Sequence, residues 1–121
     1  MREPIRDIGR LQHILEAIDR VLQHVGEKKS LDDLHLDELQ YFGIVKSIEI
    51  VGEASYKLTA EFKSAHVETP WRYIEKMRHI LVHDYYQVSK MEVWKVIQDD
   101  LPILRQQVQQ YLDELNTKEE L

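Results

Sequence analysis

The chain lacks cysteine altogether among its 121 residues. This absence excludes disulfide bonds, thiolate metal ligands and cysteine nucleophiles. The sequence also has no apolar run near the ~20 residues that a membrane span needs. Residues 1–7 contain no apolar signal core, so the sequence predicts a cytoplasmic protein with no membrane partner.

An excess of basic residues is also missing. Sixteen Lys and Arg stand against 22 Asp and Glu, which gives a formal net charge of −6. A protein that coats nucleic acid through a broad basic surface is therefore disfavoured, because such binding depends on Lys and Arg neutralising phosphates. A local site built from a few arginines stays open, and the acidic balance is also compatible with a basic protein partner.

Signals for strands and for nucleotide-binding loops are lacking too. No segment alternates apolar and polar residues, and there is no Gly-rich phosphate loop and no internal repeat. The length fits one domain with a single core. A hydrophobic content of 43% and a charged content of 31% are typical of an ordinary globular protein.

What the sequence does have is apolar residues at steps of three and four, the spacing of amphipathic helices. The first segment contains Ile8, Leu11, Leu15, Ile18, Leu22 and Val25. The second contains Leu39, Phe42, Val45, Ile48, Val51, Ala54, Leu58 and Phe62. The third contains Trp71, Ile74, Met77 and Leu81. The fourth contains Met91, Trp94, Ile97, Leu101, Leu104, Val108, Leu112 and Leu115. We therefore expect an all-α antiparallel bundle of four to five helices, one domain over residues 1–121, with a frayed tail at about 116–121.

Several residues mark where these helices begin or divide. Thr69 and Pro70 predict a helix start, with a capping hydroxyl followed by proline at the first helical position. Ser89 and Glu92 have the spacing of a capping box. Pro102 should kink or divide the last segment, because proline cannot donate a helical hydrogen bond.

Two glycines interrupt the second helical segment. Gly43 and Gly52 each cost about 1 kcal/mol relative to Ala in a helix interior. We interpret them as positions where a neighbouring helix, or the mate in a dimer, comes close.

The motif richest in chemistry is R-x4-H-x-Y, formed by Arg78, His83 and Tyr85. Arg stays charged and offers a planar fork of donors that suits phosphate oxygens. His, with an ordinary pKa of about 6.5, can both take and give a proton near neutrality. An arginine and a histidine are the minimum set for cleaving a phosphodiester without a metal.

The spacing of Arg78 and His83 leaves alternatives open. Five residues correspond to about 140° on an unbroken α-helix, so the two side chains would not share a face. Either the helix ends near Val82, or the long arginine swings around, or the site is assembled from two protomers. A structural interpretation also stands, in which Arg78 pairs with an acidic neighbour and His83 caps the helix C-terminus.

His79 and His83 have the H-x3-H spacing of two imidazole metal ligands, and Asp84 or His66 could add a third. This would make a metal-dependent hydrolase, whose activity a chelator would abolish. The glutamate of an H-E-x-x-H metalloprotease is missing, however, and so is any thiolate, so adventitious nickel or zinc binding explains the spacing better than a functional site.

Outside the motif, Glu53 stands one step from the apolar stripe of the second segment. It could orient Arg78 or His83, as acids commonly do for catalytic imidazoles, or it could lie on a solvated helix face. Trp71 and Trp94 both fall on apolar stripes, so we interpret them as core anchors rather than platforms for nucleic-acid bases.

These motifs together resemble the HEPN superfamily, and within it the HepT-like (DUF86) group. Residues 50–54, Ile-Val-Gly-Glu-Ala, are similar to the family's I-G-E-A element, and residues 69–71 to its P-x-W helix entry. Residues 77–86 resemble its M-R-x-x-x-V-H-x-Y-F element. Trp94 and residues 100–102, Asp-Leu-Pro, resemble its closing W and L-P. The order and spacing extend over nearly the whole chain.

The resemblance implies a helical fold that dimerises through the motif-bearing helices, with a composite cleft on the two-fold axis. It also implies the toxin of a type VII-like toxin–antitoxin pair, an endoribonuclease that needs no metal or other cofactor. The RNA substrate would be of the tRNA or mRNA class. The expected partner is a minimal nucleotidyltransferase (MNT-type) antitoxin that neutralises the toxin by adenylylation.

Carried onto this chain, the resemblance makes Arg78 and His83 the catalytic pair and Tyr85 the modified residue. Glu53, His79 and Asp84 become supporting residues. The family often has Asn directly after the arginine, where this chain has His79. The alternative is a non-catalytic module whose dimer cleft holds a nucleotide or docks the transferase, a function that the acidic net charge would suit.

Overall fold

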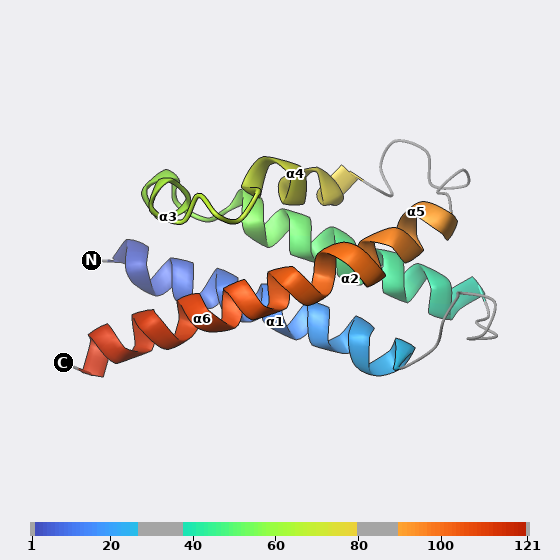
Figure 1. The fold of residues 1–121 in the computed structure, drawn as a ribbon, viewed down its shortest axis with the longest axis horizontal. Coiled ribbons are helices and arrows are strands. Elements are labelled where there is room, and N and C mark those ends of the chain that lie inside the picture. Colours follow the sequence, from blue (N-terminus) through green and yellow to red (C-terminus); the bar gives the residue numbers. More distant parts are fainter. Residues whose placement is uncertain (1, 27–37, 80–89, 121) are drawn as a thin grey trace.

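A computed structural model describes residues 2–26, 38–79 and 90–120. Every regular element in these ranges is helical, which confirms the predicted all-α fold (Figure 1). The elements are α1 (Arg2–Val25), α2 (Glu38–Tyr56), α3 (Ala60–Ala65), α4 (Trp71–Glu75), the 3-10 turn η2 (Lys76–His79), α5 (Lys90–Lys95), the π-helical segment η4 (Val96–Asp100) and α6 (Leu101–Glu120). None of the described helices is long and apolar enough to cross a membrane.

Helices in contact run antiparallel. Helix α1 packs against both α2 and α6, and the chain direction reverses at each of these contacts (Figure 1). Helix α2 has a second set of neighbours, α4 and η2. Because α2 contacts α1 on one side and η2 on another, it connects the bundle core to the segment that carries Arg78.

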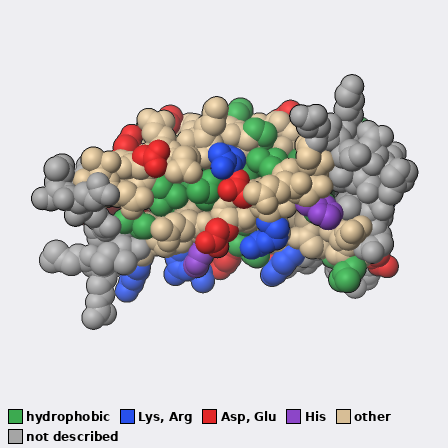
Figure 2. All heavy atoms as spheres, turned by 90° about the horizontal axis from the view of Figure 1, so that it is seen from below, with side chains coloured by type: hydrophobic (Ala, Val, Ile, Leu, Met, Phe, Trp, Pro, Cys, Tyr) green, Lys and Arg blue, Asp and Glu red, His purple; other side chains and the backbone are tan. Residues whose placement is uncertain are grey.

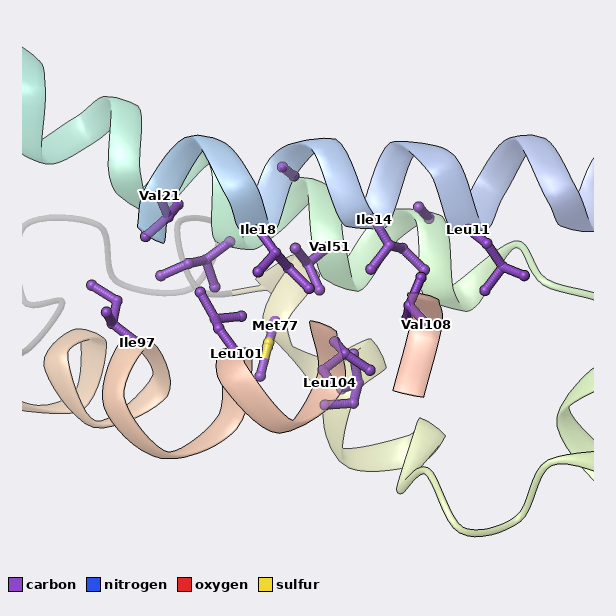
Figure 3. Close-up of a cluster of buried hydrophobic side chains, with 14 of the residues drawn as sticks. Leu11, Ile14, Ile18, Val21, Val51, Met77, Ile97, Leu101, Leu104 and Val108 are labelled. Atoms are coloured by element: carbon purple, nitrogen blue, oxygen red, sulfur yellow. The ribbon is translucent and has the colours of Figure 1, made fainter. Parts of the chain in front are cut away.

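Apolar side chains from five elements, α1, α2, η2, η4 and α6, interlock in the core. Figure 3 shows side chains of α1 (Leu11, Ile14, Ile18 and Val21) meeting Val51, Met77, Ile97, Leu101, Leu104 and Val108. The predicted stripes supply most of these residues, and Trp71 and Trp94 pack in or against the core as expected. Leu39 and Met91 depart from the prediction, since they are 81% and 83% exposed. Each is the second residue of its helix.

The second helical segment is shorter than its apolar spacing predicts. We expected one helix reaching Phe62, but α2 ends at Tyr56 and α3 begins at Ala60. Thr59 is extended (φ −65°, ψ 151°) and its hydroxyl accepts a hydrogen bond from the Phe62 N–H at 3.1 Å. The buried Asp7 carboxylate accepts two more hydrogen bonds, from the Thr59 N–H (2.9 Å) and its hydroxyl (2.7 Å). These contacts outweigh the apolar periodicity, because a satisfied cap favours a new helix start.

The third predicted helix (α4) begins at the expected position, but its first residues are capped differently from the prediction. The N-cap is Pro70, and no side chain makes a capping hydrogen bond there. The predicted capping role of Thr69 is therefore wrong: its hydroxyl donates to Gln107 at 2.7 Å and lies 2.6 Å from the Tyr111 hydroxyl, both on α6. The α-helix also ends early, at Glu75, and continues as the tighter turn η2.

The predicted division of the last segment at Pro102 is confirmed. The Leu101 N–H donates to the Val96 carbonyl, the five-residue step of a π-helix, and α6 begins at Leu101. Proline has no N–H for the α-helical bond at this position and its ring crowds the preceding turn, so a widened turn accommodates it.

The two remaining end signals concern α5 and α6. Helix α5 begins directly after Ser89, which lies outside the described residues. Helix α6 is helical to Glu120, and the fraying expected from about residue 116 stays a prediction.

Candidate functional site

Arg78 lies on η2, where the backbone of this turn presses against α2. A Cβ added to Gly52 would meet the Arg78 backbone N at 2.2 Å and the Met77 carbonyl carbon at 2.8 Å. Only glycine permits so close an approach of two backbones. The predicted close neighbour of Gly52 is therefore confirmed as η2, whereas a Cβ on Gly43 would meet no atom within 4 Å in the described part of the chain.

Two side chains hold the guanidinium of Arg78. Its Cζ lies over the ring of Tyr56, 3.4 Å from the centroid, which is a cation–π contact. Its Nε–H donates to Nε2 of His79 at 3.2 Å. The residues that the structure describes give the two terminal amino groups of Arg78 no partner, so its donor fork is unused there. The interpretation that Arg78 pairs with an acidic neighbour is therefore not supported by these residues.

A groove of about 620 Å³ lies beside this arginine. Its described lining comes from α4, η2, α5 and η4, and comprises Tyr73, Lys76, Met77, His79, Glu92, Lys95 and Val96. His79 belongs both to the groove and to the Arg78 contact, which connects the two. Two lysines on the wall supply positive charge, although the chain as a whole is acidic.

Tyr73 on the groove wall has a raised pKa. The Tyr73 hydroxyl donates to the Asp100 carboxylate at 2.6 Å, and this hydrogen bond, with partial burial and the nearby acidic charges, raises the pKa of Tyr73 to about 12. The hydrogen bond ties α4 to η4, and the raised pKa keeps Tyr73 protonated well above neutrality.

Three predicted site residues, His83, Asp84 and Tyr85, lie outside the described residues. The meeting of Arg78 with His83 therefore stays a prediction. Arg78 itself lies on the 3-10 turn η2 and not on an α-helix. In a 3-10 turn residues three apart share a face, so the rotation of about 140° does not apply to η2.

Glu53 is exposed on α2 and pairs with Lys57, with 3.5 Å between Nζ and Oε1. Among the described residues it contacts neither Arg78 nor His79, and its predicted supporting role stays a prediction. His79, in contrast, contacts Arg78 directly. A histidine can thus accept the Nε–H bond at the position where the family often has asparagine.

The predicted metal alternative has little support in the described ranges. They contain no group of three His, Asp or Glu side chains placed to hold a metal ion. His66, one candidate ligand, hydrogen-bonds the Phe62 carbonyl through Nδ1 at 2.8 Å and stacks on the Phe62 ring. The H-x3-H pair itself needs His83, which lies outside these ranges.

Sequence reasoning missed Tyr56, Tyr73, Lys76 and Lys95 as members of this neighbourhood. A signal for Tyr56 does exist: it follows Gly52 by four residues, which places it on the same face of α2. The groove lysines carried no such signal, since they meet only through the packing of α5 against the rest of the bundle.

On Figure 2, Lys and Arg side chains lie among Asp and Glu on the face seen from below. The described residues thus define an all-α helical protein with a mixed charged surface and with Arg78 beside a local groove. The particular family follows from comparison: the family model "Ribonuclease HepT-like" matches residues 14–111. The chain belongs to the HepT-like family, as its motifs predicted.

Curated relatives agree with this assignment. The chain is 34% identical over 95 residues to a "Probable ribonuclease HepT" of Thermococcus cleftensis, covering 78% of this chain and 86% of the relative. It is 34% identical over 102 residues to a "Putative RNase" of Caldanaerobacter subterraneus subsp. tengcongensis, covering 84% and 90%. A longer Methanocaldococcus jannaschii protein, named as a gamma-glutamylcyclotransferase and putative RNase, is 31% identical over 106 residues, which is 88% of this chain and 47% of that one. No solved structure matches the chain.

Proposed function

We propose that this chain is a metal-independent endoribonuclease and the toxin of a toxin–antitoxin pair. The observation that carries the proposal is the guanidinium of Arg78, held by Tyr56 and His79 with its terminal donors unused in the described residues. Membership of the HepT-like family and the names of the relatives support a ribonuclease function.

In the proposed reaction, the RNA supplies its own nucleophile. His83 accepts the proton of a ribose 2′-hydroxyl as the oxygen attacks the adjacent phosphorus, and the bond to the 5′-oxygen breaks. That leaving oxygen takes a proton from a second acid, the His83 of the dimer mate. The donors of Arg78 stabilise the negative charge that develops on the phosphoryl oxygens. The products are a 2′,3′-cyclic phosphate and a free 5′-hydroxyl.

The proposal includes a homodimer, because one imidazole cannot be base and acid in the same step. An isologous interface would bring two copies of the motif to one axis. The exposure of the apolar Met91 side chain supports a dimer interface in this region. Met91 is 83% exposed on α5, next to Glu92 of the groove wall.

Cleavage of RNA by the purified protein in EDTA tests the catalytic part. We expect the parent protein to cleave, and His83→Ala and Arg78→Ala to lose at least about a hundredfold in rate, the range for removing a general base or an oxyanion donor. Full activity of both variants would contradict the proposal, and so would activity that appears only with a divalent metal.

Neutralisation by the partner is the second part of the proposal. A nucleotidyltransferase would attach adenylate to the hydroxyl of Tyr85 and release pyrophosphate, which places bulk and negative charge beside the site. Intact mass after incubation with the transferase and ATP should increase by one or more adenylates in the parent protein but not in Tyr85→Phe. Equal modification of Tyr85→Phe would contradict this assignment.

The acidic net charge of −6 favours one alternative, a non-catalytic module that holds a nucleotide or docks the transferase. Expression in cells discriminates the two. An active toxin should arrest growth and His83→Ala should relieve the arrest, whereas a binding module should show neither effect.

A further inference from the structure

Tyr56 is the last residue of α2 and occupies an unusual position for an aromatic side chain. It is 49% exposed and lies outside the apolar core, yet one face of its ring is covered by the Arg78 guanidinium. Gly52 precedes it by one helical turn on the same face. The bare backbone at Gly52 thus admits the backbone of Arg78, and the ring of Tyr56 receives the charged end of the same residue.

The two contacts of the guanidinium are complementary. A ring 3.4 Å from Cζ restricts the plane of the group, and the bond from Nε to His79 Nε2 restricts its rotation within that plane. Neither contact uses the terminal amino groups, whose parallel N–H bonds match the two oxygens of a phosphate. Within the described residues, the arginine is therefore held in one orientation while its terminal N–H donors stay available.

We propose that Tyr56 is a positioning residue that fixes the direction of the Arg78 guanidinium before substrate binds. The functional consequence rests on the proposed ribonuclease activity. Because a donor aimed in advance need not be ordered during the reaction, the contact lowers the barrier of the chemical step more than it strengthens substrate binding.

Lys63 provides a built-in comparison at the same ring. Its Nζ lies 6.0 Å from the Tyr56 centroid and is paired with Glu75 at 3.0 Å. This cation is farther from the ring and already has a carboxylate partner. If any positive charge near the Tyr56 ring were sufficient, Lys63 would meet the requirement as well as Arg78 does. Positioning requires instead the close stack of the Arg78 guanidinium on the ring.

Steady-state cleavage of one RNA substrate by four proteins tests the proposal: the parent, Tyr56→Leu, Tyr56→Phe and Lys63→Met. We expect Tyr56→Leu to lose about tenfold in kcat with KM within about twofold, since stacking contacts of this kind are modest. Tyr56→Phe keeps the ring and should stay within about twofold of the parent in both constants. Lys63→Met should behave like the parent. Thermal unfolding of each variant checks that all four are folded.

A second readout follows Arg78 without any need for activity. In protein labelled with ¹³C and ¹⁵N at arginine, the ring current of Tyr56 should shift the Arg78 side-chain signals upfield. Arg78→Lys identifies these signals by their loss. The shift should persist in Tyr56→Phe and vanish in Tyr56→Leu.

The outcomes separate this proposal from the proposed function. An unshifted Arg78 in the parent, or a Tyr56→Leu variant that cleaves at the parental rate, overturns the positioning role. A loss of equal size in Tyr56→Phe overturns it as well, since the hydroxyl rather than the ring would then matter. If the parent cleaves no RNA, the ribonuclease proposal fails, and the arginine spectrum still decides whether Tyr56 holds Arg78.

Discussion

Gly52 is the residue on which the geometry around Arg78 depends most directly. Any side chain there would occupy the space of the Met77 and Arg78 backbone. Backbone atoms cannot move aside as a flexible side chain can, so α2 and η2 would have to move apart. The same glycine that costs helix stability therefore sets the position of the catalytic candidate.

The pair Gly52→Ala and Gly43→Ala tests this. We expect Gly52→Ala to lower the free energy of unfolding by more than about 2 kcal/mol and to reduce RNA cleavage, because η2 is displaced. Gly43→Ala should raise stability by about 0.5–1 kcal/mol, since alanine favours helix and the described neighbours leave room for its Cβ. Denaturant unfolding of both variants gives the two values. Equal effects on stability would show that the contact at Gly52 is not as close as described.

Tyr111 is a second residue with a specific chemical role, this time structural. It is 2% exposed, its hydroxyl lies 2.6 Å from Thr69 Oγ1, and it donates to Glu68 at 2.8 Å. Burial, above all, raises the pKa of Tyr111 to about 12. The hydroxyl joins α6 to the connection before α4, so it contributes to the position of η2.

This pKa predicts a loss of stability in alkali. Tyrosine has a pKa near 10 when unfolded, so between about pH 10 and 12 the unfolded chain releases a proton that the folded chain keeps. Stability from Tyr111 is thus fully present below pH 10 and falls by about 2–3 kcal/mol as the pH rises to 12. Unfolding of Tyr111→Phe in urea across this range should show a shallower decline than the parent. An identical pH slope would contradict the assignment.

Among the elements, α3 depends on a contact distant in sequence. The Asp7 carboxylate on α1 receives both the N–H and the hydroxyl of Thr59, and the same hydroxyl caps α3. Asp7 is 4% exposed, and removing its carboxylate would leave the part-buried N–H and hydroxyl of Thr59 without this acceptor. The short helix and the end of α2 beside Tyr56 are therefore fixed by α1.

Asp7→Ala should cost about 2–4 kcal/mol of unfolding free energy, because it removes two hydrogen bonds to a charged group. Asp7→Asn should cost less, since an amide oxygen can still accept one of them. Asp113→Ala is the matched control: the carboxylate of this exposed aspartate accepts from Gln109 at 3.0 Å, and its loss should stay within about 0.5 kcal/mol. A cost for Asp7→Ala no larger than that of the control would refute the cap.

The elements also show how far sequence reasoning extends. Apolar periodicity predicted the helices and their buried faces, and Pro102 marked the division before α6, because these signals are local. The break at Thr59 was missed, since it depends on Asp7, 52 residues away. The role of Thr69 was missed for the same reason: its partners lie on α6.

The candidate site was predictable to a similar degree. The R-x4-H-x-Y motif predicted Arg78 as a site residue. Gly52 predicted the close approach of another element but did not identify that element. The contact of Arg78 with Tyr56 depends on the packing of η2 against α2, and the spacing of Gly52 and Tyr56 indicates only that these two share a face of α2. His79 contacts Arg78 as the next residue on the same turn.

For the whole molecule, the proposal requires a dimer through the motif-bearing region. Met91 on α5 and Val67 before α4 are 83% and 77% exposed, so a charge at either position should leave the folded monomer intact. In sedimentation velocity we expect the parent and Val67→Glu to be dimers and Met91→Glu to shift toward monomer, because a buried charge weakens an apolar interface. A parent that sediments as a monomer at working concentration would contradict the composite site.

The central claim is that the RNA itself provides the nucleophile in a reaction driven by Arg78 and His83. It is tested most directly with two RNA substrates in EDTA, identical except for a single 2′-deoxynucleotide on the 5′ side of the mapped cleavage site. The account predicts that the all-ribose substrate is cut to a 2′,3′-cyclic phosphate and that the deoxy substrate remains intact at that site. Cleavage of both substrates at the same bond and rate would contradict it.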